Sequence, residues 1–295
     1  MKPPPFAYHD PTTIDEAAEL IGRLDNAIPL AGGQSLMPML NFRVVAPDHL
    51  IDLNRIKALS FIRIDSGTSH FGPMTRQREL EFSPDVKTTF PIISEAIRNV
   101  GHRQTRNRGT FGGSLCHLDP SAELVNMAVL HDGVLVARKG NGTREIKSTD
   151  WSKGIMTNAL DSGEILTSIE LGAWPKGHGF AFEEFARRHG DFAITAVGCL
   201  VTLETNGTIH KTALCLSGAG PAPIRVAKAE HLLSGQAPSH EAFRAAAIEA
   251  EALDAMSDAY VTGAYRKHLA RILTYRALAR AVERARANQE TKGRG

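Results

Sequence analysis

The strongest constraint on the fold of this 295-residue chain is a glycine-rich turn that occurs twice. The first turn, GGQS (32–35), follows a short apolar run, AIPL (27–30), and precedes a helical segment; the second is TFGGS (110–114). Because glycine has no Cβ, the backbone at such turns can approach an anion closely, and successive amides beside a helix N-terminus favour negative charge. Each turn alone is typical of a plain tight turn. Together they predict two sides of one site for an extended dinucleotide.

Other signatures of nucleotide, metal or hydrolytic sites are missing from the sequence. It contains neither the G-x-G-x-x-G of a dinucleotide-binding Rossmann fold nor the G-x-x-x-x-G-K-S/T of a phosphate-binding loop. Its 12 histidines form no H-x-H or H-E-x-x-H cluster, and no G-x-S-x-G nucleophile turn is present. We therefore expect no metal ligand, no nucleophile and no catalytic acid–base pair in this chain.

Charge and cysteine content narrow the class of protein further. The 34 Lys and Arg residues against 32 Asp and Glu give a formal net charge of +2, which argues against a nucleic-acid binder that relies on a basic field. Cys116, Cys199 and Cys215 lie far apart, so no disulfide framework, zinc ribbon or iron–sulfur site is expected. No run approaches the ~18 apolar residues of a membrane span, and the first residues lack the apolar core of a signal peptide. We expect a cytoplasmic protein without a membrane span.

The two halves of the chain differ in their predicted elements. The first half mixes short strands with helices and opens with a helix after Thr13, which has the spacing of a capping box with Glu16. The segment GAWPKGHG (172–179), with three glycines and a proline, indicates a domain boundary, and strands followed by helices come after it. The predicted units are two α/β subdomains at about 1–55 and 56–175, a C-terminal domain at 176–287 and a disordered tail at 288–295.

Four strings carry a family resemblance: AGGQSLMPMLNFR, RNRGTFGGSLCHLDPSAEL, RRHGDFAI and AYRKHLARILTYRAL. They resemble the FAD-binding medium subunits of the xanthine dehydrogenase and carbon monoxide dehydrogenase family, in the family's order, from about residue 3 to 285. The second string most resembles bacterial subunits that serve N-heteroaromatic hydroxylases, such as those for quinoline or nicotine. The resemblance implies an α+β fold, in which an N-terminal FAD-binding portion of two small α/β subdomains (PCMH-type) precedes a C-terminal antiparallel sheet covered by helices.

The resemblance also implies where FAD binds, with the cofactor lying between the two portions. Both glycine turns correspond to family motifs that wrap the FAD diphosphate, through Ala31, Gly32, Gly33, Gln34, Ser35 and Leu36 in the first and Thr110, Gly112, Gly113 and Ser114 in the second. Pro73 replaces a small residue usual in the family, and Phe111 replaces its usual Ile or Leu. These two departures bear on how tightly the second turn closes.

Four further residues have both a cofactor-binding and a purely structural interpretation. Glu123 corresponds to a family carboxylate that accepts hydrogen bonds from the sugar-alcohol part of FAD, but it also suits the positive end of a helix. Phe192 corresponds to a side chain that packs on the flavin ring, or is a core phenylalanine. His117 follows the second turn and either approaches FAD or is a structural histidine. Leu166 falls in a strand that the family uses near the flavin.

The roles of two groups of arginines also have more than one interpretation. Arg103, Arg106 and Arg108 either screen the diphosphate, face an acidic partner or form a solvated basic loop. The stripe made by Arg276, Arg280 and Arg284 at i, i+4 spacing is either a solvated helix face or a docking surface for another subunit.

The family's division of labour implies the function and the partners. A large subunit carrying a molybdopterin-type cofactor hydroxylates the substrate, a small subunit passes electrons through two [2Fe-2S] clusters, and FAD in the medium subunit delivers them to an acceptor. We therefore expect an electron-transfer subunit of a heterotrimer, or of a dimer of heterotrimers, that acts on an N-heteroaromatic substrate. A self-sufficient flavin oxidase or dehydrogenase, and a non-enzymatic protein that has kept the fold, are the alternatives.

Overall fold

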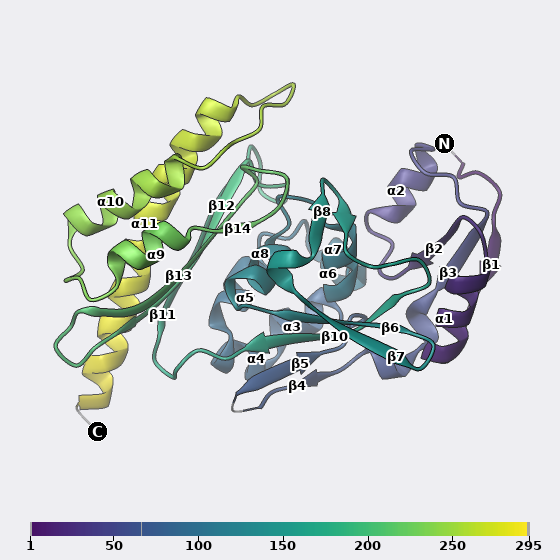
Figure 1. Ribbon diagram of the computed structural model, residues 1–295, viewed down its shortest axis with the longest axis horizontal. Helices are drawn as coiled ribbons and strands as arrows, with labels where there is room; N and C mark the ends of the chain where they lie inside the picture. Colours follow the sequence, from purple (N-terminus) through teal and green to yellow (C-terminus); the bar gives the residue numbers. More distant parts are fainter. Residues whose placement is uncertain (1, 66, 294–295) are drawn as a thin grey trace.

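The computed structural model describes residues 2–65 and 67–293 (Figure 1). A small parallel sheet with strand order β1-β3-β2 opens the chain, and helix α1 packs beside it. Thr13 caps α1 as predicted, because its Oγ1 accepts from the Glu16 amide, but the Glu16 side chain accepts from the Thr12 amide and not from that of Thr13, so the capping box is only half formed. The elements are β1 (Ala7–His9), α1 (Ile14–Arg23), β2 (Ala27–Leu30), α2 (Leu36–Asn41) and β3 (His49–Asp52).

An antiparallel sheet with the order β4-β5-β10-β6-β7 forms the second subdomain, together with a group of short helices. Its strands are β4 (Ile62–Arg63), β5 (Thr68–Phe71), β6 (Val134–Lys139), β7 (Gly142–Lys147) and β10 (Ile165–Gly172), with the separate hairpin β8 (Ser152–Gly154) and β9 (Thr157–Asn158). Its helices are α3 (Gln77–Phe82), α4 (Pro84–Thr89), α5 (Pro91–Ala96), α6 (Arg103–Arg108), α7 (Phe111–His117) and α8 (Glu123–Leu130), with 3₁₀ turns at Leu53–Arg55, Lys57–Leu59 and Ser148–Asp150.

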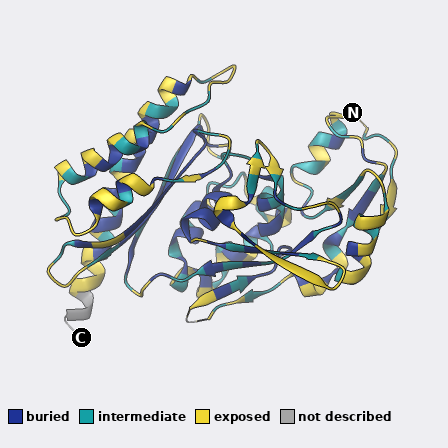
Figure 2. Ribbon diagram, viewed as in Figure 1, coloured by how far each residue is buried: buried dark blue, intermediate teal, exposed yellow. Residues whose placement is uncertain are grey.

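The C-terminal part is an antiparallel sheet with the order β11-β12-β13-β14, and its helices cover one face of it (Figure 1). Its elements are β11 (Gly179–Phe185), β12 (Thr195–Leu203), β13 (Ile209–Ser217), β14 (Ile224–Arg225), α9 (Ala227–Leu233), α10 (His240–Glu251) and α11 (Gly263–Gly293). Alternate side chains of β12 pack on opposite sides: Leu200 joins the core of the first part, and Val201 joins the core under the helices. The sheet is buried on both faces (Figure 2).

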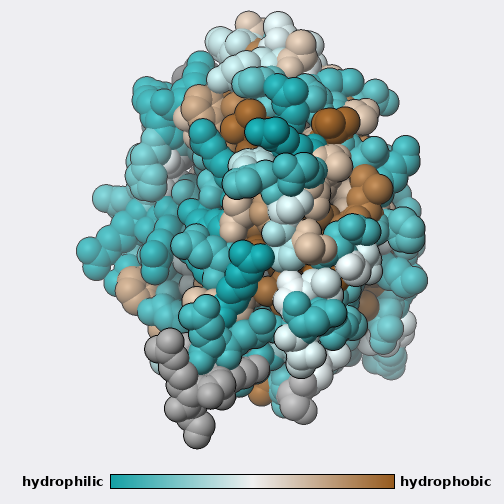
Figure 3. Space-filling model, turned by 90° about the vertical axis from the view of Figure 1, so that its left-hand side faces the viewer, coloured by the Kyte–Doolittle hydropathy of each residue, from teal (hydrophilic) through white to brown (hydrophobic). Residues whose placement is uncertain are grey.

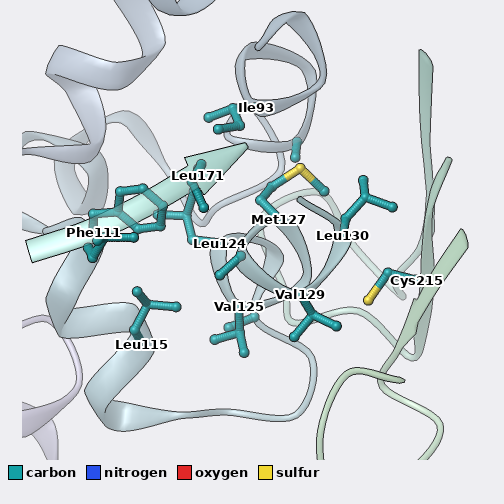
Figure 4. Close-up of a cluster of buried hydrophobic side chains, with 14 of the residues drawn as sticks. Ile93, Phe111, Leu115, Leu124, Val125, Met127, Val129, Leu130, Leu171 and Cys215 are labelled. Carbon is teal, nitrogen blue, oxygen red and sulfur yellow. The ribbon is translucent and has the colours of Figure 1, made fainter. Parts of the chain in front are cut away.

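Helix α8 connects the cores of the two parts. All eight of its residues are buried, including the polar Glu123 and Asn126, so the helix is enclosed by protein on every side. Figure 4 shows Met127 and Leu130 of α8 between Leu171 of β10 on one side and Cys215 of β13 on the other. The outer face of the C-terminal helices, by contrast, is mostly hydrophilic, with apolar residues interspersed (Figure 3).

The predicted α+β fold is confirmed, and two local features differ from expectation. The chain is helical up to Gly293, where the sequence predicted a disordered tail from residue 288; residues 294 and 295 lie outside the described part. The basic segment before the second glycine turn is helix α6, and its Arg106 forms an ion pair with Glu81 at 2.9 Å. None of the helices in the described residues is both long and apolar enough to cross a membrane.

Two arginines of the stripe on α11 join the halves of the molecule. The Glu95 carboxylate of α5 accepts hydrogen bonds from Arg280 at 2.6 Å, from Arg284 at 2.7 Å and from the Phe182 amide of β11 at 2.9 Å. The same arginines donate to backbone carbonyls of β11. Arg280 and Arg284 therefore act within the chain, whereas Arg276 is exposed.

We predict that Glu95→Gln lowers the free energy of unfolding by about 1–3 kcal/mol, because one part-buried carboxylate neutralises two guanidinium groups. Urea denaturation of the full chain measures this effect. Glu145→Gln, at an exposed position of β7, is the matched control and should change stability by less than about 0.5 kcal/mol. Equal stability of the two variants would contradict the bridging role of Glu95.

Candidate cofactor-binding site

The structure brings the two glycine turns into direct contact. A Cβ added to Gly32 would lie 2.3 Å from the carbonyl oxygen of Arg108, just before the second turn. A Cβ added to Gly113 would lie 3.6 Å from the Cβ of Ala31. The turns come from segments about eighty residues apart in the sequence. Only glycine fits at position 32, because a larger residue would force the two backbones apart.

A polar network that the sequence analysis did not identify fixes this contact. Asn54 donates to the carbonyl of Ala31 at 2.9 Å, and Arg76 donates both to Asn54 and to the carbonyl of Arg108. Burial and the neighbouring charge of Arg108 lower the pKa of Arg76. The guanidinium group of Arg76 therefore links Asn54, which binds the first turn, to the backbone just before the second turn.

The first turn presents a row of open amides. Within the described residues, none of the backbone N–H groups of residues 32–35 donates to a protein acceptor, although Met37 donates back to the Gly33 carbonyl at 3.0 Å. Gly33 has a φ of 73°, which a residue with a side chain rarely adopts. Ser35 caps α2 without a side-chain hydrogen bond. Successive unpaired amides at a helix start are suited to the two charged phosphates of a dinucleotide.

Between Phe111 and Ser114 the second turn, in contrast, has no open amide, which differs from the expectation that both turns offer donors. Every N–H group from residue 111 to 114 has an acceptor: Phe111 donates to the Thr75 carbonyl at 3.0 Å, Gly112 to the Pro73 carbonyl at 2.8 Å, Gly113 to Thr110 Oγ1 at 3.0 Å and Ser114 to the Thr110 carbonyl at 3.2 Å. The glycines of this turn therefore serve close packing.

Pro73 and Phe111, the two residues that depart from the family pattern, stabilise the second turn. The Pro73 carbonyl accepts from Gly112, and a Cβ on Gly112 would lie 2.4 Å from that of Pro73. Phe111 is fully buried and meets Phe71 edge to face, with ring centroids 5.6 Å apart. Gln77, which the sequence analysis also missed, binds both ends of the turn. Its backbone amide donates to the Gly109 carbonyl, and its side-chain amide donates to Ser114 Oγ. The turn is closed tightly.

Helix α7 leads from the second turn to a group of ionisable side chains. Its seven residues span ~10 Å and end at His117, after which Leu118 adopts a left-handed conformation with a φ of 55°. Asp119 accepts from the Ser121 amide at 2.8 Å, and burial raises its pKa. Burial lowers the pKa of His117. Along the chain, His117 and Asp119 lie between the second turn and the start of α8.

Glu123 begins α8 and is almost completely buried, with 4% of its surface exposed. Burial, with the nearby charge of Glu184, raises the pKa of Glu123 to about 8. No ion pair involves Glu123 within the described residues. A carboxylate placed only to complement the helix start would lie near water, so the burial of Glu123 favours a ligand as its partner.

Leu166 and Phe192 occupy contrasting environments. Leu166, on β10, is 4% exposed and packs inside the core of the first part. Phe192 lies in the loop between β11 and β12, with 59% of its surface exposed. The structure thus excludes the alternative of a core phenylalanine at position 192. An exposed ring on a loop at the junction of the two parts is available for stacking on a flat ligand.

Comparison with known proteins identifies the family. Residues 4–174 match the family described as FAD binding domain in molybdopterin dehydrogenase, and residues 180–281 match CO dehydrogenase flavoprotein C-terminal domain. The chain belongs to the FAD-binding medium subunits of the carbon monoxide dehydrogenase and xanthine dehydrogenase family. The predicted family is confirmed.

Relatives match over nearly their whole length. The chain is 36% identical over 293 residues to the 6-hydroxypseudooxynicotine dehydrogenase complex subunit alpha of Paenarthrobacter nicotinovorans, covering 99% of both chains. It is similar to carbon monoxide dehydrogenase from Hydrogenophaga pseudoflava, with a TM-score of 0.93, 34% identity and coverage of 96% and 99%. It is also similar to quinoline 2-oxidoreductase from Pseudomonas putida 86, with a TM-score of 0.92, 29% identity and coverage of 97% and 99%.

The medium subunits of this family carry FAD, and the residues present here fit that cofactor. Open amides at residues 32–35 suit its diphosphate, and the buried Glu123 suits a polyol hydroxyl. Within the described residues no group of His, Cys, Asp and Glu side chains is arranged to hold a metal ion. The chain is therefore an oxidoreductase subunit whose own site takes an organic cofactor.

We predict that Gly32→Ala weakens FAD binding at least about tenfold, which corresponds to ~1.4 kcal/mol, because its Cβ separates the two turns. Fluorescence titration of the apo chain with FAD measures the dissociation constant. Gly67→Ala is the control, because a Cβ there meets no atom within 4 Å. Unchanged FAD affinity in Gly32→Ala would show that the contact between the turns does not shape the site.

A pH-dependent stability follows from Glu123. Its pKa is raised from 4.5 to about 8, so between these values the unfolded chain releases a proton that the folded chain retains, and stability falls as pH rises. We predict that Glu123→Gln raises the free energy of unfolding of the apo chain by roughly 1–3 kcal/mol at about pH 8 and by almost nothing at about pH 4.5. Urea denaturation across this range is the measurement. Parallel pH profiles for the variant and the wild type would disprove the burial of this charge.

Proposed function

We propose that this chain is the FAD-carrying electron-transfer subunit of a heterotrimeric molybdenum hydroxylase. In this role it takes electrons from two [2Fe-2S] clusters of a small partner subunit and passes them through FAD to an external acceptor. A large partner subunit with a molybdopterin-type cofactor hydroxylates the substrate. The heterotrimer, or a dimer of heterotrimers, is the proposed working unit.

The observation that carries this proposal is the row of four open amides at residues 32–35, held against the second turn by Asn54 and Arg76. It supplies a diphosphate site without any nearby nucleophile. FAD brings the redox chemistry, so the protein needs only to bind it, orient it and set its surroundings. In this role the chain needs no catalytic acid–base pair of the kind that substrate chemistry requires.

Each predicted site residue has a proposed role within this function. The first turn binds the diphosphate through its amides, and the second lets the cofactor chain pass close to the backbone of α7. Phe192 covers the flavin ring, and Glu123 accepts a hydrogen bond from the polyol. The proposed FAD site comprises Ala31, Gly32, Gly33, Gln34, Ser35, Leu36, Thr110, Gly112, Gly113, Ser114, His117, Glu123, Leu166 and Phe192.

The proposed substrate class is an N-heteroaromatic ring compound. Support comes from relatives along the whole chain that are named for a nicotine-derived compound and for quinoline. A relative named for carbon monoxide is comparably similar. The residues of this chain therefore do not distinguish between these substrates, and the choice of substrate depends on the large subunit.

We predict that the purified chain takes up about one FAD per polypeptide, and that its flavin is reduced by an N-heteroaromatic substrate only when both partner subunits are present. Co-purification from the native host and anaerobic flavin spectroscopy measure both properties. Flavin bleaching by substrate in the isolated chain would support a self-sufficient dehydrogenase instead. Failure to take up FAD would refute the electron-transfer role.

A further inference from the structure

Arg76 is a half-buried arginine without a carboxylate partner. Its guanidinium group donates to the Asn54 side chain and to the Arg108 carbonyl, neither of which carries a charge. Within the residues that the structure describes, Arg76 forms no ion pair. A guanidinium group has five N–H donors, and those that these two bonds leave over can bind water or a ligand.

The carboxylates around Arg76 have other hydrogen-bond partners. Glu79 accepts from the backbone amide of Arg76 at 2.8 Å. Asp52 accepts from the Tyr8 hydroxyl at 2.6 Å and from the Asn54 amide at 2.9 Å. Burial, followed by the charge of Arg108, lowers the pKa of Arg76 by more than Glu79 and Asp52 raise it. The protein therefore leaves the charge of Arg76 incompletely neutralised.

Helix capping does not explain the position of Arg76. The residue caps the start of α3, where the helix dipole makes a positive charge unfavourable. A cation that is half buried, unpaired and at the unfavourable end of a helix costs stability. Such a cost indicates a function other than support of α3.

Arg108 places a second unpaired charge beside the first. It is the last residue of α6, and its exposed side chain has neither a hydrogen bond nor an ion pair among the described residues. Arg106 of the same helix, in contrast, pairs with Glu81 at 2.9 Å. Because two guanidinium groups close together repel each other, an anion between or beside them is favourable. Of the three interpretations open for Arg108 in the sequence, this geometry favours the one in which it screens the diphosphate.

The two arginines lie next to the open amides of the first glycine turn. The carbonyl oxygen to which Arg76 donates lies 2.3 Å from the position of a Cβ on Gly32. Through Asn54, Arg76 also holds the carbonyl of Ala31, the residue before the row of amides. Backbone amides supply only partial positive charge, whereas a diphosphate carries full negative charges. The guanidinium groups supply the full charge that the amides lack.

We propose that Arg76 is a further phosphate-binding residue, whose charge, together with that of Arg108, neutralises the diphosphate of FAD while the amides of residues 32–35 orient it. This inference rests on the proposed FAD-carrying role and adds a cationic side to its phosphate site. Arg76 then has two roles, because the same guanidinium group that joins the two turns also binds the anion between them. A guanidinium group is suited to both, since its planar donors can serve several acceptors at once.

The test separates the charge of Arg76 from its bridging contacts. Neither Arg76→Lys nor Arg76→Gln can reproduce the two bonds of the guanidinium group, but only Arg76→Lys keeps the charge. In about 10 mM salt, Arg76→Lys should bind FAD at least about fivefold more tightly than Arg76→Gln. In about 1 M salt the difference should fall below about twofold, because the screening length shrinks from ~30 Å to ~3 Å. Fluorescence titration of each full-length apo chain with FAD measures the dissociation constants.

Arg108→Gln is a second variant that removes charge without removing any contact of the folded chain. Its FAD affinity should be at least about threefold lower than that of the wild type in about 10 mM salt, and nearly equal to it in about 1 M salt. Arg244→Gln, at an exposed position of α10 on the opposite side of the molecule (Figure 1), makes the same change in net charge and should bind FAD as the wild type does. Urea denaturation of each variant checks that it is folded.

Equal FAD affinities of Arg76→Lys and Arg76→Gln in low salt would reduce Arg76 to a structural bridge and overturn the inference. An unchanged affinity in Arg108→Gln would overturn it as well, and this variant decides the question if the chains altered at position 76 do not fold. In either case, a wild type that takes up FAD leaves the proposed function intact. A wild type that binds no FAD at either salt concentration would overturn the proposed function itself, and the role of Arg76 with it.

Discussion

The close contact between the two glycine turns is the constraint on which the rest of the site depends. Gly32 lies so near the carbonyl of Arg108 that no side chain fits, and Arg76 bridges the two backbones through Asn54. Because the turn between β2 and α2 meets the turn between α6 and α7 there, the position of one turn fixes the other. Helix α7 follows directly from the second turn, so the contact also helps to position the segment that leads to Glu123 at the start of α8.

Local signals in the sequence were sufficient for many elements. The helix cap at Thr13, the strand AIPL and the two glycine turns depend on neighbouring residues, and each is present in the structure. The family resemblance added the order of the units and the FAD site. Composition alone did not indicate that α11 continues to Gly293.

Long-range partners could not be predicted from single-sequence patterns. Asn54 and Arg76 are separated by 22 residues, and Arg76 and Arg108 by 32, so no periodicity links them. Two adjacent glutamates, Glu183 and Glu184, are equivalent in sequence, yet the strand sends one to Arg280 and leaves the other unpaired.

The difference between the two turns follows from the cost of unpaired amides. A buried N–H group without an acceptor is unfavourable, so the second turn, enclosed by Pro73, Thr75 and Phe111, must satisfy its amides within the protein. The first turn is partly exposed, and water can satisfy its amides until an anion replaces it. Similar glycine strings therefore have different roles in the proposed FAD site: the first is proposed to donate to the phosphates, and the second to let the cofactor pass close to the backbone. Glycine content alone does not distinguish them, but the acceptors around each turn do.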